Sequence, residues 1–162
     1  MYEVLVYVYE NYGGSADCAD RQQLGRRLNT LGFGRDAIQQ ALSWLDGLDR
    51  TASGLPAAER EALPSTLAAP TSPPLRIYGA HEMERLGGDG IACLRFLEDA
   101  GALSPALREI VIDRALAASD EAPLALDDLK IIVMMVYWHA GINPGILVLD
   151  ELTDNASARR PH

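Results

Sequence analysis

The sequence predicts a mainly α-helical fold in which a winged-helix-like N-terminal part, with a short β-hairpin or strand, precedes a small helical bundle. Three observations support this prediction. Apolar residues recur every three or four positions through most of the chain, which is the spacing of one buried helix face. A proline-rich stretch divides the helical segments into two groups, and one short β-prone run follows it. Three helices, a loop, a strand and a further helix follow one another as in a winged helix-turn-helix.

The composition is that of a folded globular protein with an acidic surface. Apolar residues make up 48% of the 162-residue chain and charged residues 23%, a balance far from that of disordered chains. A chain of this length folds without disulfides or metal, and Cys18 and Cys93 have no metal-ligand or CxxC spacing. The formal net charge of −9 repels phosphate backbones, so it disfavours non-specific nucleic-acid binding and favours a basic partner.

The first third of the chain predicts three helices, over residues 2–12, 20–31 and 35–48. Asp20 is placed to cap the second helix, and Gly32 is placed to end it in the left-handed conformation. The predicted buried residues are Met1, Leu5, Val8 and Tyr12 in the first helix, Leu24, Leu28 and Leu31 in the second, and Ile38, Ala41, Leu42, Leu45 and Leu48 in the third, with Trp44 at its margin. The third helix leaves a polar side for water or a partner, made of Arg35, Asp36, Gln39, Gln40, Ser43 and Asp46.

Residues 51–74 interrupt the helical pattern with five prolines among many alanines and serines. This composition predicts a flexible loop that holds at most one helical turn, near residues 57–62. Residues 75–78 are β-branched or aromatic at two of four positions and follow a proline, which predicts a short strand at the edge of the wing.

The second half of the chain predicts a group of helices with clear boundaries. Residues 81–86 and 90–100 are predicted as two helices, separated by Gly87 and Gly88. Residues 104–118 begin with a serine in the capping position and a proline in the first turn, so they predict a third helix.

Residues 127–140 predict the central helix of the bundle. The segment 131–138 is apolar on every side, so a helix here must be enclosed by other elements. A buried strand is the alternative for so short a run. Core packing explains the bulky side chains of this segment, and the alternative is a surface for a homodimer or another partner, formed by Met134, Met135, Tyr137 and Trp138.

These patterns divide the chain into three predicted parts: a winged-helix-like unit over residues 1–86 that includes the loop 51–74, a helical unit over residues 87–152 packed on it, and a disordered tail over residues 153–162. No apolar run approaches the ~20 residues that a membrane span needs. No basic region precedes the first apolar run, as it does in a signal peptide. We therefore expect a cytoplasmic protein that does not enter a membrane.

Five stretches of the sequence resemble the Smg family of bacterial proteins, in the same order and at similar spacing. They are residues 2–12, Leu31-Gly32-Phe33, Ala41-Leu42-Ser43-Trp44-Leu45, Arg76-Ile77-Tyr78 and Asp128-Leu129-Lys130. The likeness covers about residues 1–50 and 75–145. It implies a bacterial cytosolic protein of a family whose genes often lie beside those for a DNA-processing protein and a topoisomerase. It provides no catalytic or binding residues to carry over.

The residues with catalytic or metal-binding chemistry do not form a recognisable set. His81, His139 and His162 lack the local spacing of zinc ligands. Adjacent carboxylates such as Asp127 and Asp128 point in different directions on a helix, and no nucleophile or phosphate-binding motif is complete. We predict a protein that is not an enzyme and has no catalytic residues, bound metal or cofactor.

We expect a regulatory or adaptor protein that contacts an unidentified protein partner, with a link to nucleic-acid metabolism suggested by the gene neighbours. The alternative is a winged-helix DNA- or RNA-binding protein. Residues 1–50 carry five basic and seven acidic residues, which is not the basic footprint of a nucleic-acid reader. Solvation on amphipathic helices explains the exposed arginines more simply. The nucleic-acid face of the alternative consists of Arg21, Arg26, Arg27, Arg35 and Arg76.

Overall fold

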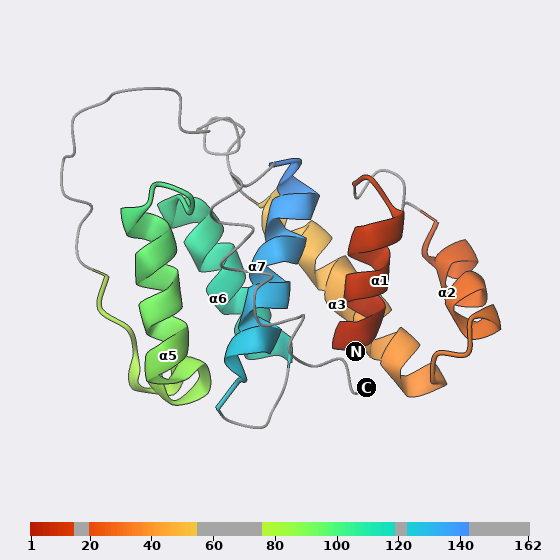
Figure 1. The fold of residues 1–162 in the computed structure, drawn as a ribbon, viewed down its shortest axis with the longest axis horizontal. Coiled ribbons are helices and arrows are strands. Elements are labelled where there is room, and N and C mark those ends of the chain that lie inside the picture. The colour runs from red at the N-terminus through yellow and green to blue at the C-terminus, as the bar shows by residue number, and fades with distance from the viewer. Residues whose placement is uncertain (15–19, 55–75, 119–122, 143–162) are drawn as a thin grey trace, which may run out of the picture.

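The computed structural model describes residues 1–14, 20–54, 76–118 and 123–142, and within these ranges every regular element is an α-helix (Figure 1). The prediction of a mainly α protein is therefore confirmed. The helices are α1 (Tyr2–Asn11), α2 (Arg21–Thr30), α3 (Arg35–Ser53), α5 (Ala80–Asp99), α6 (Pro105–Ala118) and α7 (Leu126–Ala140).

The helices follow one another along the long axis of the molecule. α5 lies at one end, beside α6 and α7, and α2 lies at the other end, outside α1 and α3 (Figure 1). α7 packs against α1, α3, α5 and α6, whereas α2 packs on α3. The helices from the two halves of the chain therefore share one core, in which α7 is central.

α7 is enclosed because it is apolar on every side. Leu129, Ile132, Val133, Met135 and Val136 are each at most 1% exposed. Burial of each such side chain contributes about 1.5–3 kcal/mol, so this helix provides a large share of the hydrophobic stabilisation. The predicted central helix is confirmed, and the alternative of a buried strand is excluded.

Two aromatic side chains at the end of α7 tie it to its neighbours. The Tyr137 hydroxyl donates a hydrogen bond of 2.9 Å to the Ala102 carbonyl, and the Trp138 indole N–H donates one of 2.7 Å to the Tyr12 carbonyl. Both rings are buried, and the bonds satisfy the polar atoms that burial would otherwise strip of water.

The helix starts that the sequence predicts are confirmed at α2 and α6. The Asp20 carboxylate accepts a 2.9 Å hydrogen bond from the Gln23 amide, and the Ser104 hydroxyl accepts one of 3.3 Å from the Leu107 amide. Each bond satisfies an amide that the first turn leaves without a partner. Gly32 has φ +92° after the end of α2, as predicted for a left-handed helix end.

α5 is interrupted at Gly87, where φ is 66° and ψ is 172°. The residues before and after it are helical, which agrees with the two helices predicted over residues 81–86 and 90–100. Beyond the interruption, Gly90 brings α5 close to α7: a Cβ on this residue would lie 3.2 Å from Leu129 Cδ2.

The predicted β-hairpin or strand is wrong, and with it the winged-helix-like N-terminal part. Residues 76–78 are not in a strand, and the described ranges contain no strand with which they could pair. A β-prone run without a partner gains no ladder of hydrogen bonds. Side-chain packing holds the segment instead. Tyr78 is 8% exposed, and the Arg76 guanidinium lies 4.8 Å from the centre of the Tyr78 ring.

Two side chains lie differently from the predicted faces of α2 and α3. Leu31 is 53% exposed because it follows the last residue of α2. Phe33 takes the inward position and packs on Tyr7, with ring centroids 5.7 Å apart. Trp44 is 4% exposed rather than marginal, because α6 covers that side of α3.

No helix in the described ranges is long and apolar enough to cross a membrane. α3 continues through Ser53, into the predicted loop. The rest of that loop from residue 55, including the turn expected near residues 57–62, lies outside the described residues, as does the tail 153–162. The division into units at residues 86 and 152 stays a prediction.

Candidate functional site

Two hollows open along the outward-facing side of α3. The first, between α2 and α3, has a volume of about 420 Å³, and the second, among the start of α1, the middle of α3 and the end of α6, has a volume of about 940 Å³. Gln39 and Ser43 line both, so we treat them as one α3 groove made of an α2–α3 hollow and an α3–α6 hollow. The other lining residues are Gly25, Asn29, Arg35, Ile38, Leu42 and Asp46 in the α2–α3 hollow, and Met1, Tyr2, Gln40, Trp44, Gly47, Arg50, Arg114, Ala117 and Ala118 in the α3–α6 hollow.

The polar wall of the groove follows from the amphipathic pattern of α3. Gln39, Ser43, Asp46 and Arg50 are three or four residues apart, so they lie on one side of the helix. The side that packs into the core carries Ile38, Ala41, Leu45 and Leu48. Because the apolar side of α3 is buried in the core, its polar side faces outward.

A pair of ion contacts fixes α2 beside α3. Arg21 Nη2 lies 2.6 Å from Asp49 Oδ2, and Arg21 Nε lies 3.2 Å from Asp46 Oδ1. The two helices approach closely at Gly25, where a Cβ would lie 3.3 Å from Leu42 Cδ1. The α2–α3 hollow therefore has walls held by both charge and packing.

A polar seam joins α3 and α6 beside the α3–α6 hollow. The Trp44 indole N–H donates a 3.0 Å hydrogen bond to the Arg114 carbonyl, and the Thr51 hydroxyl donates one of 3.0 Å to Asp113. The Arg114 side chain lies directly over Gly47: a Cβ there would be 1.9 Å from Arg114 Nη1. Only a glycine leaves room for the guanidinium in this position.

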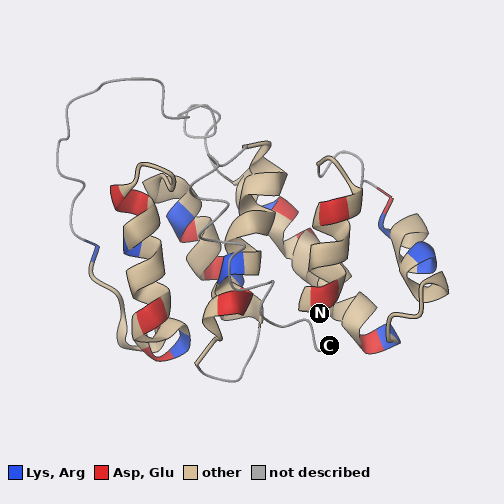
Figure 2. Ribbon diagram, in the orientation of Figure 1, with Lys and Arg blue, Asp and Glu red and all other residues tan. Residues whose placement is uncertain are grey.

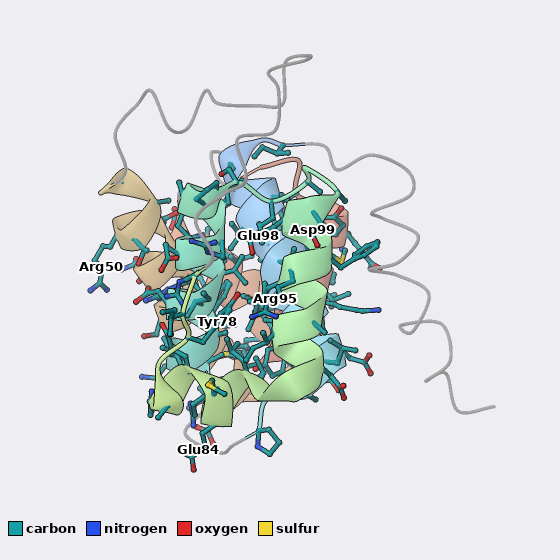
Figure 3. The ribbon with its side chains drawn as sticks, turned by 90° about the vertical axis from the view of Figure 1, so that its left-hand side faces the viewer. Arg50, Tyr78, Glu84, Arg95, Glu98 and Asp99 are labelled. Carbon is teal, nitrogen blue, oxygen red and sulfur yellow. The ribbon has the colours of Figure 1, made fainter. Side chains whose placement is uncertain are left out.

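The α3–α6 hollow has no carboxylate among its described lining residues, although the chain as a whole carries a net charge of −9. Acidic residues occur on α1, α5 and α7 as well as on α3 (Figure 2). Arg50 is exposed and projects outward from α3, away from Tyr78, Glu98 and Asp99 on the α5 side of the molecule (Figure 3). The described residues provide no ion-pair partner for it.

The Tyr2 hydroxyl, at the α1 edge of the hollow, is buried and has no hydrogen-bond partner among the described residues. Burial raises the pKa of Tyr2 to about 12, and the nearby Asp128 carboxylate adds to the effect. The phenol is therefore neutral at physiological pH and able to donate a hydrogen bond.

The five arginines of the predicted nucleic-acid face are not brought together. Arg21 is held by aspartates of α3, and Arg27 donates a 3.2 Å hydrogen bond to the hydroxyl of Tyr12, which follows α1. Arg26 is exposed, and Arg35 lines the α2–α3 hollow. The segment that begins at Arg76 lies at the α5 end of the molecule, far along the axis from α2 (Figure 1).

The four residues of the predicted partner surface on α7 are mostly inside the protein. Met135, Tyr137 and Trp138 are 0%, 1% and 7% exposed, and Met134 is half-buried against the core. Their packing within the monomer accounts for their apolar character.

Arg76 takes part in an ion-pair network outside the groove. Its guanidinium binds both carboxylate oxygens of Glu82, at 2.9 and 2.8 Å, and Glu109 at 2.7 Å. Hydrogen bonds from Arg76 and then from the Gly79 amide lower the pKa of Glu82 to about 2. This network fastens the segment before α5 to α5 and α6, which explains Arg76 structurally.

The described lining of the groove provides amide, hydroxyl and guanidinium groups and, at Asp46, a carboxylate, and it contains no histidine or cysteine. In the part of the chain that the structure describes, no group of three or more His, Cys, Asp and Glu residues could hold a metal ion.

The sequence marks Gln39, Gln40 and Ser43 as an outward-facing set, but it does not reveal that Arg50 and Arg114 join them. Arg114 comes from α6, and only the packing of α6 on α3 places it there. The available signal is Gly47, because a glycine inside an otherwise helical pattern often has a packing reason such as a close approach.

The described residues thus define an all-helical protein with a polar groove along one helix. The chain belongs to the family described as "Protein of unknown function (DUF494)", which matches residues 1–162. Similar relatives are proteins named "Protein Smg homolog": one from Leptothrix cholodnii, 44% identical over the full length of both chains, and one from Methylibium petroleiphilum, 47% identical over 94% of this chain and 93% of the relative. A third, from Bordetella avium, is 43% identical over both full lengths. The resemblance to the Smg family is confirmed, and no solved structure matches the chain.

Proposed function

We propose that this chain is a non-enzymatic adaptor that holds a segment of a partner protein in the α3 groove. One observation carries the proposal: the two hollows share Gln39 and Ser43, so a continuous polar surface follows α3 between α2 on one side and α6 on the other. A small-molecule pocket encloses most of its ligand, whereas a groove that follows a helix suits an extended segment or a helix of a partner.

The side chains of the groove support binding to protein. Gln39, Gln40, Ser43 and Arg50 are exposed, and they offer hydrogen-bond donors and acceptors to a peptide backbone and its side chains. Trp44 and the alanines of α6 add apolar contact area to the floor. This combination of an apolar centre and a polar rim is usual for protein interfaces.

Site-specific photo-crosslinking in cells tests the proposal. A photoreactive amino acid at Gln40 or Ser43 is expected to give the same crosslinked protein adduct from both positions. The matched control is Glu84, which is exposed and points outward from α5 (Figure 3), and it is expected to give no such adduct.

An adduct of equal yield from Glu84, or none from either groove position, would contradict the proposal. The adduct formed from one of these two positions should also disappear when the other, Gln40 or Ser43, is replaced by a Trp that fills the hollow. Circular dichroism of each variant checks that the helices are intact, so that loss of the adduct reports on the groove itself.

A further inference from the structure

We infer that the segment held in the α3–α6 hollow is acidic, and that Arg50 and Arg114 bind its carboxylates. This inference rests on the proposed function and specifies the partner's chemistry. It starts from a contrast of charge: the chain has a net charge of −9, yet the described lining of this hollow contains two arginines and no carboxylate, with Arg114 paired to Asp113 beside the lining. On so acidic a protein, a lining of this composition disfavours the basic partner that the total charge suggests.

Arg114 is held in position to bind such a segment. Its Nε and Nη2 atoms donate hydrogen bonds of 2.9 and 2.7 Å to Asp113, which fix the plane of the guanidinium. Its Nη1 atom lies over Gly47 and makes no hydrogen bond to a described residue. An arginine whose orientation is already fixed loses less conformational entropy when it binds a carboxylate.

Arg50 provides the second positive charge at the rim of the same hollow. It is exposed, projects outward from α3 (Figure 3), and has no ion-pair partner among the described residues. Gln39, Gln40 and Ser43 continue the line of donors along α3 away from Arg50. A carboxylate bound at Arg50 thus leaves the rest of the segment beside amide and hydroxyl groups.

One acidic residue of the groove favours a peptide over a nucleic acid. Asp46 lines the α2–α3 hollow, which continues the groove. A nucleic-acid strand carries a charge on every phosphate, so a strand that follows the whole groove would bring a phosphate to this aspartate. A peptide places its carboxylates only where the arginines are and neutral residues elsewhere.

An NMR titration of the full chain tests the inference. The probe is a decapeptide of alternating glutamate and alanine, and the matched peptide has glutamine in place of glutamate. We expect the acidic peptide to shift the backbone amide signals of Gln39, Ser43, Gly47, Arg50 and Ala117, with weaker binding as salt rises. The glutamine peptide is expected to bind about tenfold more weakly, the difference that one charge-assisted hydrogen bond makes.

Two charge reversals separate a specific site from general attraction. Arg50→Glu is expected to weaken binding of the acidic peptide at least about tenfold. Arg26→Glu makes the same change at an exposed arginine of α2 that also lacks an ion-pair partner among the described residues, and it is expected to leave binding within about twofold because no residue of α2 lines the α3–α6 hollow.

Equal losses in the two variants, or shifts spread over α2 and α5, would overturn the inference, as would no binding of the acidic peptide. Equal binding of the glutamine peptide would overturn it too while leaving the proposed groove function standing. A single-stranded oligonucleotide that displaces the acidic peptide would assign the site to nucleic acid instead. Absence of a position-specific crosslink in cells tests the proposed function separately.

Discussion

His139 Nε2 on α7 lies 2.7 Å from Asp49 Oδ1 on α3, so the last turn of the central helix is bonded to the helix that carries the groove. The imidazole N–H donates, and the carboxylate accepts. Asp49 also accepts from Arg21 Nη2 at 2.6 Å, so one carboxylate joins α2, α3 and α7. Asp49 thereby holds α3, which carries the groove, to α7 in the core and to α2 beside the α2–α3 hollow.

Replacement of His139 by Ala is expected to lower the free energy of unfolding by about 0.5–1.5 kcal/mol, the usual contribution of one hydrogen bond. Asp49→Ala is expected to cost more, because it also removes one of the ion-pair partners of Arg21. Urea unfolding of both single variants and the double variant measures the coupling. If the losses in the double variant simply add, the contact between His139 and Asp49 contributes nothing by itself.

Gly87 is expected to tolerate a side chain poorly because its φ of 66° lies in the left-handed region. Gly87→Ala should destabilise the protein by about 1–2 kcal/mol. The matched control is Gly88→Ala, since a Cβ there meets nothing within 4 Å and φ is not positive; it should be neutral or stabilising by up to about 1 kcal/mol. Thermal unfolding of the two variants compares them directly, and equal melting temperatures would contradict the prediction.

Much of the helical architecture could be predicted from the sequence, because the residues that begin and end helices agree with the observed packing. Asp20 and Ser104 occupy helix starts, and Gly87 interrupts a helix where the pattern breaks. The strand expected over residues 75–78 failed for a non-local reason. Strand formation depends on a partner strand elsewhere in the chain, which the described ranges do not contain, and Tyr78 is buried in the helical core instead.

Only part of the groove could be predicted from the sequence. Helical periodicity exposes Gln39 and Ser43, but it cannot state that α6 lies beside them or that Arg114 covers Gly47. The arginines were equally ambiguous, because an exposed Arg26 and an ion-paired Arg21 have the same appearance in a sequence. Their roles depend on partners that are distant along the chain.

Glu82 is expected to stabilise the protein above pH 4.5 and to lose this effect in acid. Its pKa falls from 4.5 to about 2 in the folded chain, chiefly through hydrogen bonds from Arg76. Since the unfolded chain binds the proton first, stability declines as pH falls from 4.5 towards 2. Glu82→Gln should flatten this part of the curve of unfolding free energy against pH, whereas the exposed Glu84→Gln should not. A steep acid decline that persists unchanged in Glu82→Gln would assign it to other carboxylates.

Tyr137 is expected to limit stability at the alkaline end. Burial raises its pKa from 10.0 to about 12, so the folded chain keeps the proton that the unfolded chain releases above pH 10. The stabilisation is complete below pH 10 and is lost as pH rises towards 12. Tyr137→Phe removes this titration and also the 2.9 Å bond to Ala102, at a cost of about 1 kcal/mol at neutral pH. Urea midpoints across this range should therefore fall less steeply in the variant.

Gly47→Ala separates the binding role of Arg114 from the stability of the fold. The new Cβ would lie 1.9 Å from Arg114 Nη1, so the guanidinium must leave its present position over residue 47. The moving group is the far end of a flexible side chain, and Ala is preferred to Gly in a helix by about 1 kcal/mol. The two effects on stability oppose each other, so the free energy of unfolding should change by less than about 1 kcal/mol.

Binding of the acidic decapeptide should nevertheless fall several-fold in Gly47→Ala, and Gly88→Ala should bind as the parent chain does. Urea unfolding and the NMR titration, performed on the same samples, measure the two quantities. A variant that retains full binding while its Arg114 side-chain signals have moved would show that the position of this guanidinium does not matter. Loss of binding together with a large loss of stability would point to a disturbed α3–α6 contact instead.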